Sequence, residues 1–226
     1  MRTRERDDFN FWPVYSDLAL SIVLVLLLFL LAQLVFNSRL IITQDLARLR
    51  VQRQQAGVHA RLALAPGVDT IVVDGSEQTI ILNADFLFDT DDTTLTANGR
   101  RLLGNLSEIL RTNEKQFTRV AVEGHADHRP SRRFRGDSPD YGNWRLSAER
   151  AIRVVQLFQA AGLAGNRLAV VGRSSYEPVD TLFRRYPFDT DPREVRELDE
   201  SLRRNRRLVI RLFYSEAVRV PSGARR

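Results

Sequence analysis

Two short segments of the chain hold polar residues that are able to bind a ligand. The first is the run Gly124-His125-Ala126-Asp127, and the second is a helical pattern that contains Asn143, Ser147 and Arg150. Carboxylates and guanidinium groups make charge-assisted hydrogen bonds, and residues four apart share one face of a helix. Each residue also has a structural alternative: Asp127 as a turn residue, Arg150 as a solvated helix arginine and Asn143 as a helix cap. Taken singly, these residues do not decide between binding and structure.

The same residues do not form a catalytic set. The sequence contains no cysteine, and His125 has no Cys or His partner at the spacing of a metal site. An enzyme would have to use His125 with Asp127, and a lone Gly-His-x-Asp pattern is too common to support hydrolysis. We therefore expect no enzyme activity, no cofactor and no metal, and we interpret His125 as a structural residue.

A further ionisable residue, Asp17, lies directly before a long apolar run. Because Pro13 suits the first turn of a helix, Asp17 should lie about one turn inside that helix. The apolar run offers no charge to pair with Asp17. A carboxyl group that enters a membrane helix is a candidate proton or ion site, because apolar surroundings favour its neutral form. The alternative is an interfacial aspartate that stays in contact with water, and both interpretations remain open.

The apolar run predicts a membrane-spanning helix. From Leu18 to Phe36 every residue is apolar except Ser21 and Gln33, and about 19 helical residues cover roughly the 30 Å hydrocarbon core. A cleaved signal peptide is disfavoured because the run is long and lacks a small-residue cleavage pattern. A buried core helix is disfavoured because the run is apolar all round. We predict a retained anchor over residues 13–36.

The rest of the chain divides into a tail, a linker and a domain. Residues 1–12 form a short polar tail, and residues 37–66 carry apolar residues at helical spacing, which predicts an amphipathic linker helix. Pro66-Gly67 marks the boundary to a domain over residues 67–226. The net charge of +6 comes mostly from scattered arginines without interleaved aromatic residues, so we expect no nucleic-acid binding. Positive charges flank the span on both sides and do not orient it.

The predicted domain alternates between strand and helix patterns. Two short strands flank an Asp74-Gly75 turn, which predicts a hairpin. Thr96 is the predicted N-cap of the first helix. Strands that alternate with helices of this length predict an α/β domain with helices packed on a sheet. The predicted strands are 70–73, 78–82, 119–122, 167–171 and 208–213, and the predicted helices are 95–110 and 143–161.

Several motifs follow one another in a known order. They are Val122–Asp127 (VEGHAD), Asn143–Ala151 (NWRLSAERA), Gly172 with Pro178, and Arg204–Arg207 (RNRR). Together they resemble the OmpA C-terminal domain family, and the Asn-Trp-x-Leu-Ser version of the second motif is most similar to MotB-type motor stators. The resemblance covers residues from about 80 to 213 and implies an α/β fold of the βαβαβ type, with helices packed on a mixed sheet.

This resemblance implies noncatalytic binding of the peptidoglycan stem peptide, with Asp127 and Arg150 holding diaminopimelate. The physical chemistry agrees, because a zwitterion needs a carboxylate for its ammonium group and a guanidinium fork for its carboxylate. Asn143 and Ser147 would add neutral hydrogen bonds near a helix N-terminus, which favours an anion. Arg206 either borders the site or caps the last strand.

A second resemblance concerns the segment Trp12-Pro13-Val14-Tyr15-Ser16-Asp17. Its Trp…Tyr-x-Asp pattern before the span is similar to MotB-type stators, whose aspartate binds the translocated ion. For this chain it implies an ion-binding Asp17, a cytoplasmic N-terminus and a periplasmic domain on the bacterial inner membrane. It also implies a multi-span MotA-like partner and a homodimer, because one helix cannot enclose an ion path.

The resemblance leaves the process open. Flagellar rotation and a Zorya-type antiphage defence motor are the two candidates, and a passive tether between inner membrane and cell wall is the alternative to a motor. The segments 128–141 and 182–202 depart from the shortest family members without interrupting a motif. We expect them to affect ligand access, dimer contacts or selectivity.

Overall fold

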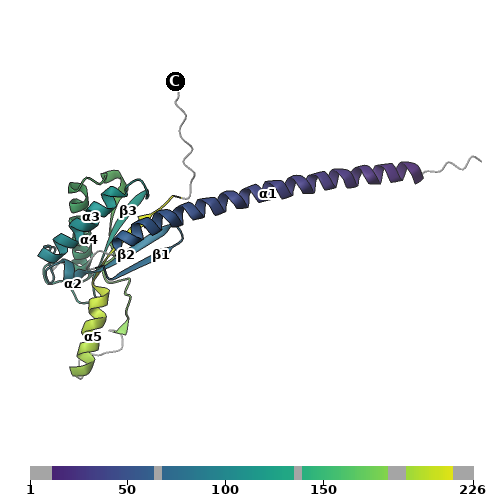
Figure 1. Cartoon of the computed structure of the whole chain (residues 1–226). Helices are drawn as coiled ribbons and strands as arrows, with labels where there is room; N and C mark the ends of the chain where they lie inside the picture. The colour runs from purple at the N-terminus through teal and green to yellow at the C-terminus, as the bar shows by residue number, and fades with distance from the viewer. Residues whose placement is uncertain (1–11, 64–67, 135–138, 183–191, 216–226) are drawn as a thin grey trace, which may run out of the picture. The chain divides into compact units, whose positions relative to one another are not determined.

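The computed structural model describes residues 12–63, 68–134, 139–182 and 192–215 (Figure 1). The chain divides into two compact units, residues 1–47 and residues 48–226. One helix, α1 (Trp12–Leu62), contributes to both units. The predicted tail before Trp12 and the predicted boundary at Pro66-Gly67 lie outside the described residues.

The first unit consists of the apolar part of α1. Every large apolar side chain from Leu18 to Phe36 is exposed. Ser21 and Ser38 turn their hydroxyl groups back to the backbone carbonyl four residues earlier, at 2.8 and 2.7 Å. This satisfies the hydroxyl groups within the helix, as a hydrocarbon environment requires. By length and composition, α1 is the one helix among the described residues that is suited to cross a membrane.

The second unit is built on a five-stranded mixed sheet. Its strands are β1 (Thr70–Asp74), β2 (Glu77–Asn83), β3 (Arg119–His125), β4 (Leu168–Gly172) and β5 (Arg207–Phe213). They lie in the order β1-β2-β5-β3-β4, with antiparallel pairs up to β3 and a parallel pair β3-β4. Gly75 in the β1-β2 turn has a φ of +54°, which a glycine adopts without strain. The predicted hairpin is therefore present.

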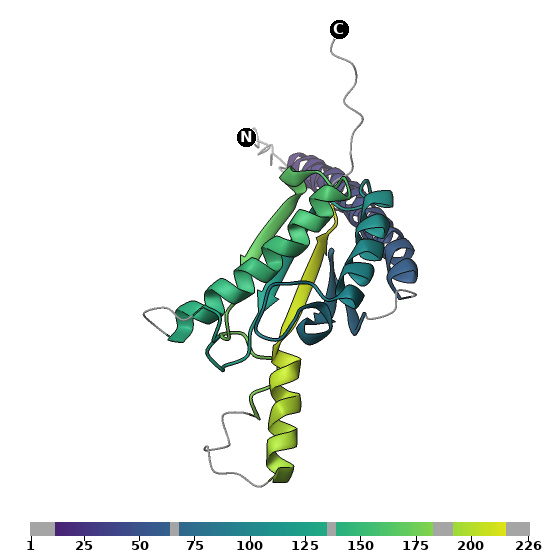
Figure 2. The ribbon, with the colours of Figure 1, turned by 90° about the vertical axis from the view of Figure 1, so that its left-hand side faces the viewer.

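Two helices, α3 (Ala97–Thr112) and α4 (Pro139–Ala160), lie across one face of this sheet (Figure 2). Alternate residues of the central strands, such as Val122 and Ile210, are fully buried in the core that these helices share. The fold class is thus confirmed as α/β with helices packed on a mixed sheet. The remaining helices are α2 (Ala84–Leu87), the 3₁₀ turn η1 (Gly165–Arg167) and α5 (Pro192–Asn205).

The last turns of α1 belong to the core of the second unit. Val51, Val58 and Leu62 are at most 3% exposed and join the main hydrophobic cluster. Gln55 Nε2 donates a hydrogen bond to the carbonyl oxygen of Gly75 at 3.0 Å. Burying the three aliphatic side chains stabilises the unit by about 5 kcal/mol. The compact unit consequently starts at Arg48, within the segment predicted as a linker.

Local signals explain where the helices begin and end. Thr96 caps α3 as predicted, because its Oγ1 accepts a hydrogen bond from the Gly99 backbone N–H at 2.9 Å. α4 begins at Pro139 rather than at Asn143, since a proline followed by an acidic residue suits a first helical turn. No element was predicted for residues 182–202, yet α5 occupies their described C-terminal part and extends to Asn205.

Candidate functional site

Asp127 lies in the loop after β3, and both of its carboxylate oxygens are engaged. Oδ1 accepts a hydrogen bond from the Arg129 backbone N–H at 2.9 Å, and Oδ2 accepts one from Arg206 Nη1 at 2.6 Å. The first contact is the local turn bond expected of an ordinary loop aspartate. The second comes from the junction of α5 and β5. The fold thus places Arg206 beside Asp127. This position agrees with the alternative in which Arg206 borders the predicted site.

Arg206 bridges two carboxylates. Its Nε and Nη2 donate to Asp85 Oδ1 and Oδ2 at 2.8 and 2.7 Å, a bidentate pair, while Nη1 reaches Asp127. Burial alone would lower the pKa of Arg206, but hydrogen bonds to Asp85 and Asp127 raise it above its ordinary value. The cluster Asp85–Arg206–Asp127 contains two carboxylates and one guanidinium, and Arg203 Nε lies 3.9 Å from the same Asp85 carboxylate.

Arg150 projects from α4 and is 3% exposed. Its Nε donates to the Asp92 carbonyl oxygen at 2.8 Å, and its guanidinium carbon lies 5.2 Å from the centroid of the Phe88 ring. Among the described residues, no carboxylate oxygen lies within 4.0 Å of this guanidinium. Burial lowers the pKa of Arg150 below its ordinary value. The more distant carboxylates of Asp85 and Asp91 oppose this shift without cancelling it. A buried guanidinium without a direct counter-ion favours a carboxylate ligand.

Asn143 and Ser147 are buried residues of α4, and their side chains form hydrogen bonds with backbone groups of the chain. Asn143 Oδ1 accepts from the Ser131 N–H at 3.1 Å, and its Nδ2 donates to the carbonyl oxygens of Asp127 and Arg129 at 3.1 and 3.0 Å. Ser147 Oγ accepts from the backbone N–H of Ser174 at 3.1 Å. Both side chains therefore hold the loop after β3 and the turn after β4 against α4.

Close packing against α4 explains why a glycine, Gly124, stands in the Gly-His-x-Asp motif. A Cβ atom at Gly124 would lie 2.0 Å from the carbonyl oxygen of Ser147, a distance that no side chain tolerates. Gly172 makes a similar approach from β4, where a Cβ atom would lie 3.0 Å from Ala148 Cβ. These close contacts place the C-terminal ends of β3 and β4 directly against α4. They fix the position of Asp127 relative to Arg150.

Sequence reasoning missed the loop that supports the site from the other side. Asp91 has a φ of +52° and accepts hydrogen bonds from Ser131 Oγ at 2.7 Å and from the N–H groups of Arg132 and Arg133 at 2.7 and 3.0 Å. Loop 89–94 thereby meets the loop after β3. The run Asp89-Thr90-Asp91-Asp92 was the available signal, since aspartates tolerate left-handed turns.

His125 and Glu123 point to the opposite face of the sheet from Gly124. Burial alone would raise the pKa of Glu123, but His125 and the guanidinium groups of Arg211 and Arg173 hold it at about 2. Burial lowers the pKa of His125, so its imidazole is neutral at pH 7. His125 Nε2 lies 3.7 Å from Glu123 Oε2. No group of three potential metal ligands occurs in the described parts of the chain.

Asp17 belongs to the first unit and lies within α1, beyond its first turn as predicted. Its backbone carbonyl accepts the hydroxyl of Ser21 at 2.8 Å. From Trp12 to Ser38, Asp17 is the only charged residue of the sequence. It is therefore the only carboxyl group within the segment from Trp12 to Ser38.

Sequence comparisons relate part of the chain to the OmpA family and to two curated proteins. The OmpA family matches residues 87–182. The uncharacterized protein YtxE of Bacillus subtilis (strain 168) is 34% identical over 101 residues, which are 44% of this chain and 39% of that protein. The peptidoglycan-associated lipoprotein of Rhizobium meliloti (strain 1021) is 28% identical over 142 residues, which are 62% of this chain and 73% of that protein. The chain thus spans about two fifths of the first relative's length.

Solved structures share the fold. A MotB-like protein from Desulfovibrio vulgaris superposes with a TM-score of 0.59 at 22% identity, over 76% of this chain and 99% of that one. The cell wall anchor of the T6SS from Pseudomonas aeruginosa has a TM-score of 0.50 at 29% identity, over 74% of this chain and 99% of that one. Because the family match spans α3, β3, α4 and β4, and the chain superposes on these structures, the second unit contains an OmpA-like domain.

Proposed function

We propose that the OmpA-like domain binds the peptidoglycan stem peptide, and that Asp127 and Arg150 recognise diaminopimelate. One observation carries the proposal. The Arg150 guanidinium is buried without a carboxylate oxygen within 4.0 Å among the described residues. A ligand carboxylate would supply the counter-ion through bidentate hydrogen bonds. The similarity to a peptidoglycan-associated lipoprotein and to a cell wall anchor supports the same ligand.

The ammonium group of the ligand would bind at Asp127. Arg206 occupies Oδ2 of this carboxylate, but it also holds Asp85 through two parallel hydrogen bonds. When an ammonium group replaces Arg206 at Asp127, the arginine keeps its counter-ion at Asp85. The exchange therefore leaves no guanidinium unpaired. An unpaired, partly buried guanidinium would be costly.

Asn143 and Ser147 would serve this site as positioning residues. Their side-chain groups hold the backbone of the loop after β3 and the turn after β4, so they place Asp127 rather than touch the ligand. Arg206 would act at the border of the site, next to Asp127.

The test of this proposal measures how the full chain in detergent sediments with purified peptidoglycan sacculi. Arg150→Ala should weaken binding about tenfold or more, because it removes a charge-assisted bidentate contact. Arg153→Ala is the matched control, since Arg153 is exposed on the same helix. Circular dichroism should show that both variants are folded. Equal sedimentation of Arg150→Ala and the parent chain would remove Arg150 from the site.

We further infer that the chain is the B-type subunit of an ion-driven motor. α1 would cross the bacterial inner membrane with its N-terminus in the cytoplasm and the OmpA-like domain in the periplasm. Asp17 would bind the translocated ion, in a homodimer associated with a multi-span MotA-like subunit. The candidate span and the lone carboxyl group at its N-terminal end support this role. Flagellar rotation and Zorya-type antiphage defence both fit such a motor.

Two experiments test the membrane arrangement. A reporter that is active only in the periplasm, fused after Arg226, should be active; activity of a cytoplasmic reporter alone would refute the assignment to the cell wall. The intact chain should also copurify with a protein that has several membrane spans. Wall binding without such a partner would leave a passive tether as the function.

A further inference from the structure

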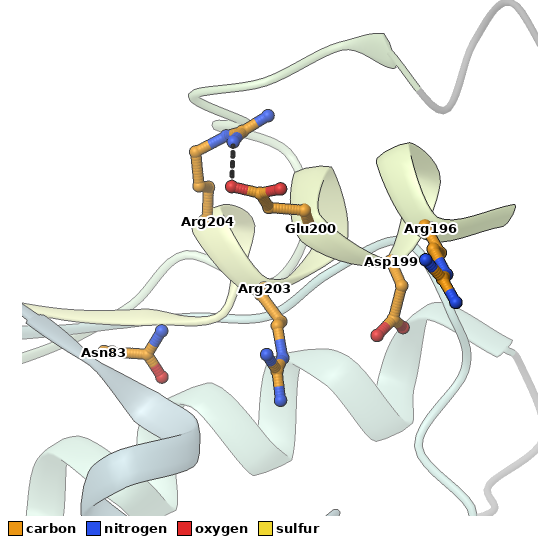
Figure 3. A pocket seen from close by; sticks show the side chains of 6 residues that line it. All are labelled: Asn83, Arg196, Asp199, Glu200, Arg203 and Arg204. Carbon is orange, nitrogen blue, oxygen red and sulfur yellow. Dashed lines mark hydrogen bonds and ion pairs between the residues drawn. The ribbon is translucent and has the colours of Figure 1, made fainter. Parts of the chain in front are cut away.

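A pocket of about 620 Å³ lies beside α5 (Figure 3). Arg196, Asp199 and Arg203 project from the same side of this helix, as their spacing of three and four residues requires. Glu200 and Arg204 lie on its other side. The residues that line the pocket are Asn83, Arg196, Asp199, Glu200, Arg203 and Arg204.

The arginines of the pocket differ in how well they are paired. Arg204 is neutralised, because it donates to Glu200 at 3.2 Å and, through Nε, to Asp180 at 3.0 Å. Among the described residues, the ion pair of Arg203 is a long one, 3.9 Å from its Nε to Asp85 Oδ2. Arg196 forms no ion pair within the described part of the chain. This face of α5 therefore presents two guanidinium groups with unused hydrogen-bonding capacity.

Two residues of the pocket lie next to residues of the proposed diaminopimelate site. On one side, Arg203 approaches the Asp85 carboxylate that also holds Arg206. On the other side, Asp199 lies 3.8 Å from Arg129, whose backbone N–H is bonded to Asp127. A peptide whose diaminopimelate occupies the site would have a residue adjacent to diaminopimelate close to α5.

We propose that this pocket is a second subsite, in which Arg196 and Arg203 bind a carboxylate of the stem peptide outside diaminopimelate. The inference rests on the proposed function and assigns a role to the described part of α5. A guanidinium fork matches a carboxylate in two parallel hydrogen bonds. The two arginines are seven positions apart, about 10 Å along the helix, a distance that two long side chains can close onto one group. The free α-carboxylate of the D-glutamyl residue before diaminopimelate is the group of this chemistry in the stem peptide.

The experiment compares three probes by calorimetry with the full chain in detergent. The probes are free meso-diaminopimelate, the tripeptide L-alanyl-γ-D-glutamyl-meso-diaminopimelate, and the same tripeptide with its glutamyl α-carboxylate amidated. The parent chain should bind the acid tripeptide about tenfold more tightly than the amide. The double variant Arg196→Ala/Arg203→Ala should lose this preference and keep its affinity for free diaminopimelate.

The control variant is Arg111→Ala/Arg119→Ala, which removes the same charge from exposed arginines. It should keep the preference for the acid. If it loses the preference as the pocket variant does, net charge rather than the pocket explains the effect, and the inference is wrong. Equal affinity of the parent for acid and amide would overturn the subsite while leaving the diaminopimelate site intact. Failure of the parent to bind any of the probes would overturn the proposed function itself.

Discussion

Arg206 donates a hydrogen bond to Asp127 at 2.6 Å, although the two residues lie 79 positions apart in the chain. They meet because β3 and β5 are neighbours in the sheet, where His125 pairs with Arg207. The carboxylate proposed for the ligand's ammonium group is thereby held by a cation of the same chain. The proposed binding of an ammonium group would therefore exchange one cation for another at this oxygen.

The Asp85–Arg206 pair should influence this exchange. Asp85→Asn removes the second carboxylate, so Arg206 would hold Asp127 more strongly and compete with the ligand. We expect affinity for sacculi to fall about three- to tenfold. Asp74→Asn, at the exposed end of β1, is the matched control and should bind like the parent. Unchanged binding of Asp85→Asn would show that Arg206 does not compete with the ligand.

Two glycine substitutions should have opposite effects on stability. Gly124→Ala would force a Cβ atom to within 2.0 Å of the Ser147 carbonyl oxygen, so it should destabilise the domain by about 3 kcal/mol. Gly104 lies within α3, and beyond the backbone of its own helix nothing lies within 4 Å of its Cβ position, so Gly104→Ala should stabilise by roughly 0.5–1 kcal/mol. Urea unfolding of a chain that begins at Arg48 measures both. Equal stabilities would contradict the close approach of β3 to α4.

Glu123 should make the domain sensitive to acid. Its folded pKa of about 2 lies below the ordinary value of 4.5, so the unfolded chain binds more protons between these values. The stabilisation, about 3 kcal/mol, is fully present above about pH 4.5 and is lost as the pH falls towards 2. Glu123→Gln should reduce the slope of unfolding free energy against pH in this window. An unchanged slope would show that the Glu123 carboxylate gains nothing from its cationic neighbours.

The end of α1 should contribute to the stability of the domain in the full chain. Leu62→Ala removes a fully buried side chain and should cost about 2–4 kcal/mol in the unfolding of the second unit. Leu46→Ala is the matched control, because Leu46 is 52% exposed in the first unit. A chain that starts at Val68 should be less stable than one that starts at Arg48. If both truncated chains unfold at the same urea concentration, the helix end is not part of the core.

Asp17→Asn should separate the motor from the tether. Asparagine resembles aspartate in size and polarity but cannot take up and release a proton. Expression, membrane insertion and wall binding should stay intact, while an ion-dependent phenotype should disappear. Asp17→Glu should restore it in part, because the titrating group returns. Wild-type behaviour of Asp17→Asn in a working assay would leave only the tether.

Patterns that depend on near neighbours could be predicted from the sequence. The uninterrupted apolar run predicted a span-length helix, and Thr96 and Asp74-Gly75 predicted a cap and a hairpin that the structure contains. Each of these signals lies within a few residues, where periodicity, capping and turn geometry act. The motif order likewise indicated an OmpA-like domain, while the assignment of Asp127 and Arg150 as site residues stays a prediction.

Contacts between distant residues were decided only by the tertiary structure. The order β2-β5-β3 brings the ends of these strands together and so creates the cluster Asp85–Arg206–Asp127. Helical spacing from residue 37 onwards is the same whether a helix stands free or packs, so it did not reveal that Leu62 is a core residue. The polarity of Asn143 and Ser147 indicated that they make hydrogen bonds. Only the packing of α4 on the sheet determined that their partners are the backbone of the loop after β3 and of the turn after β4.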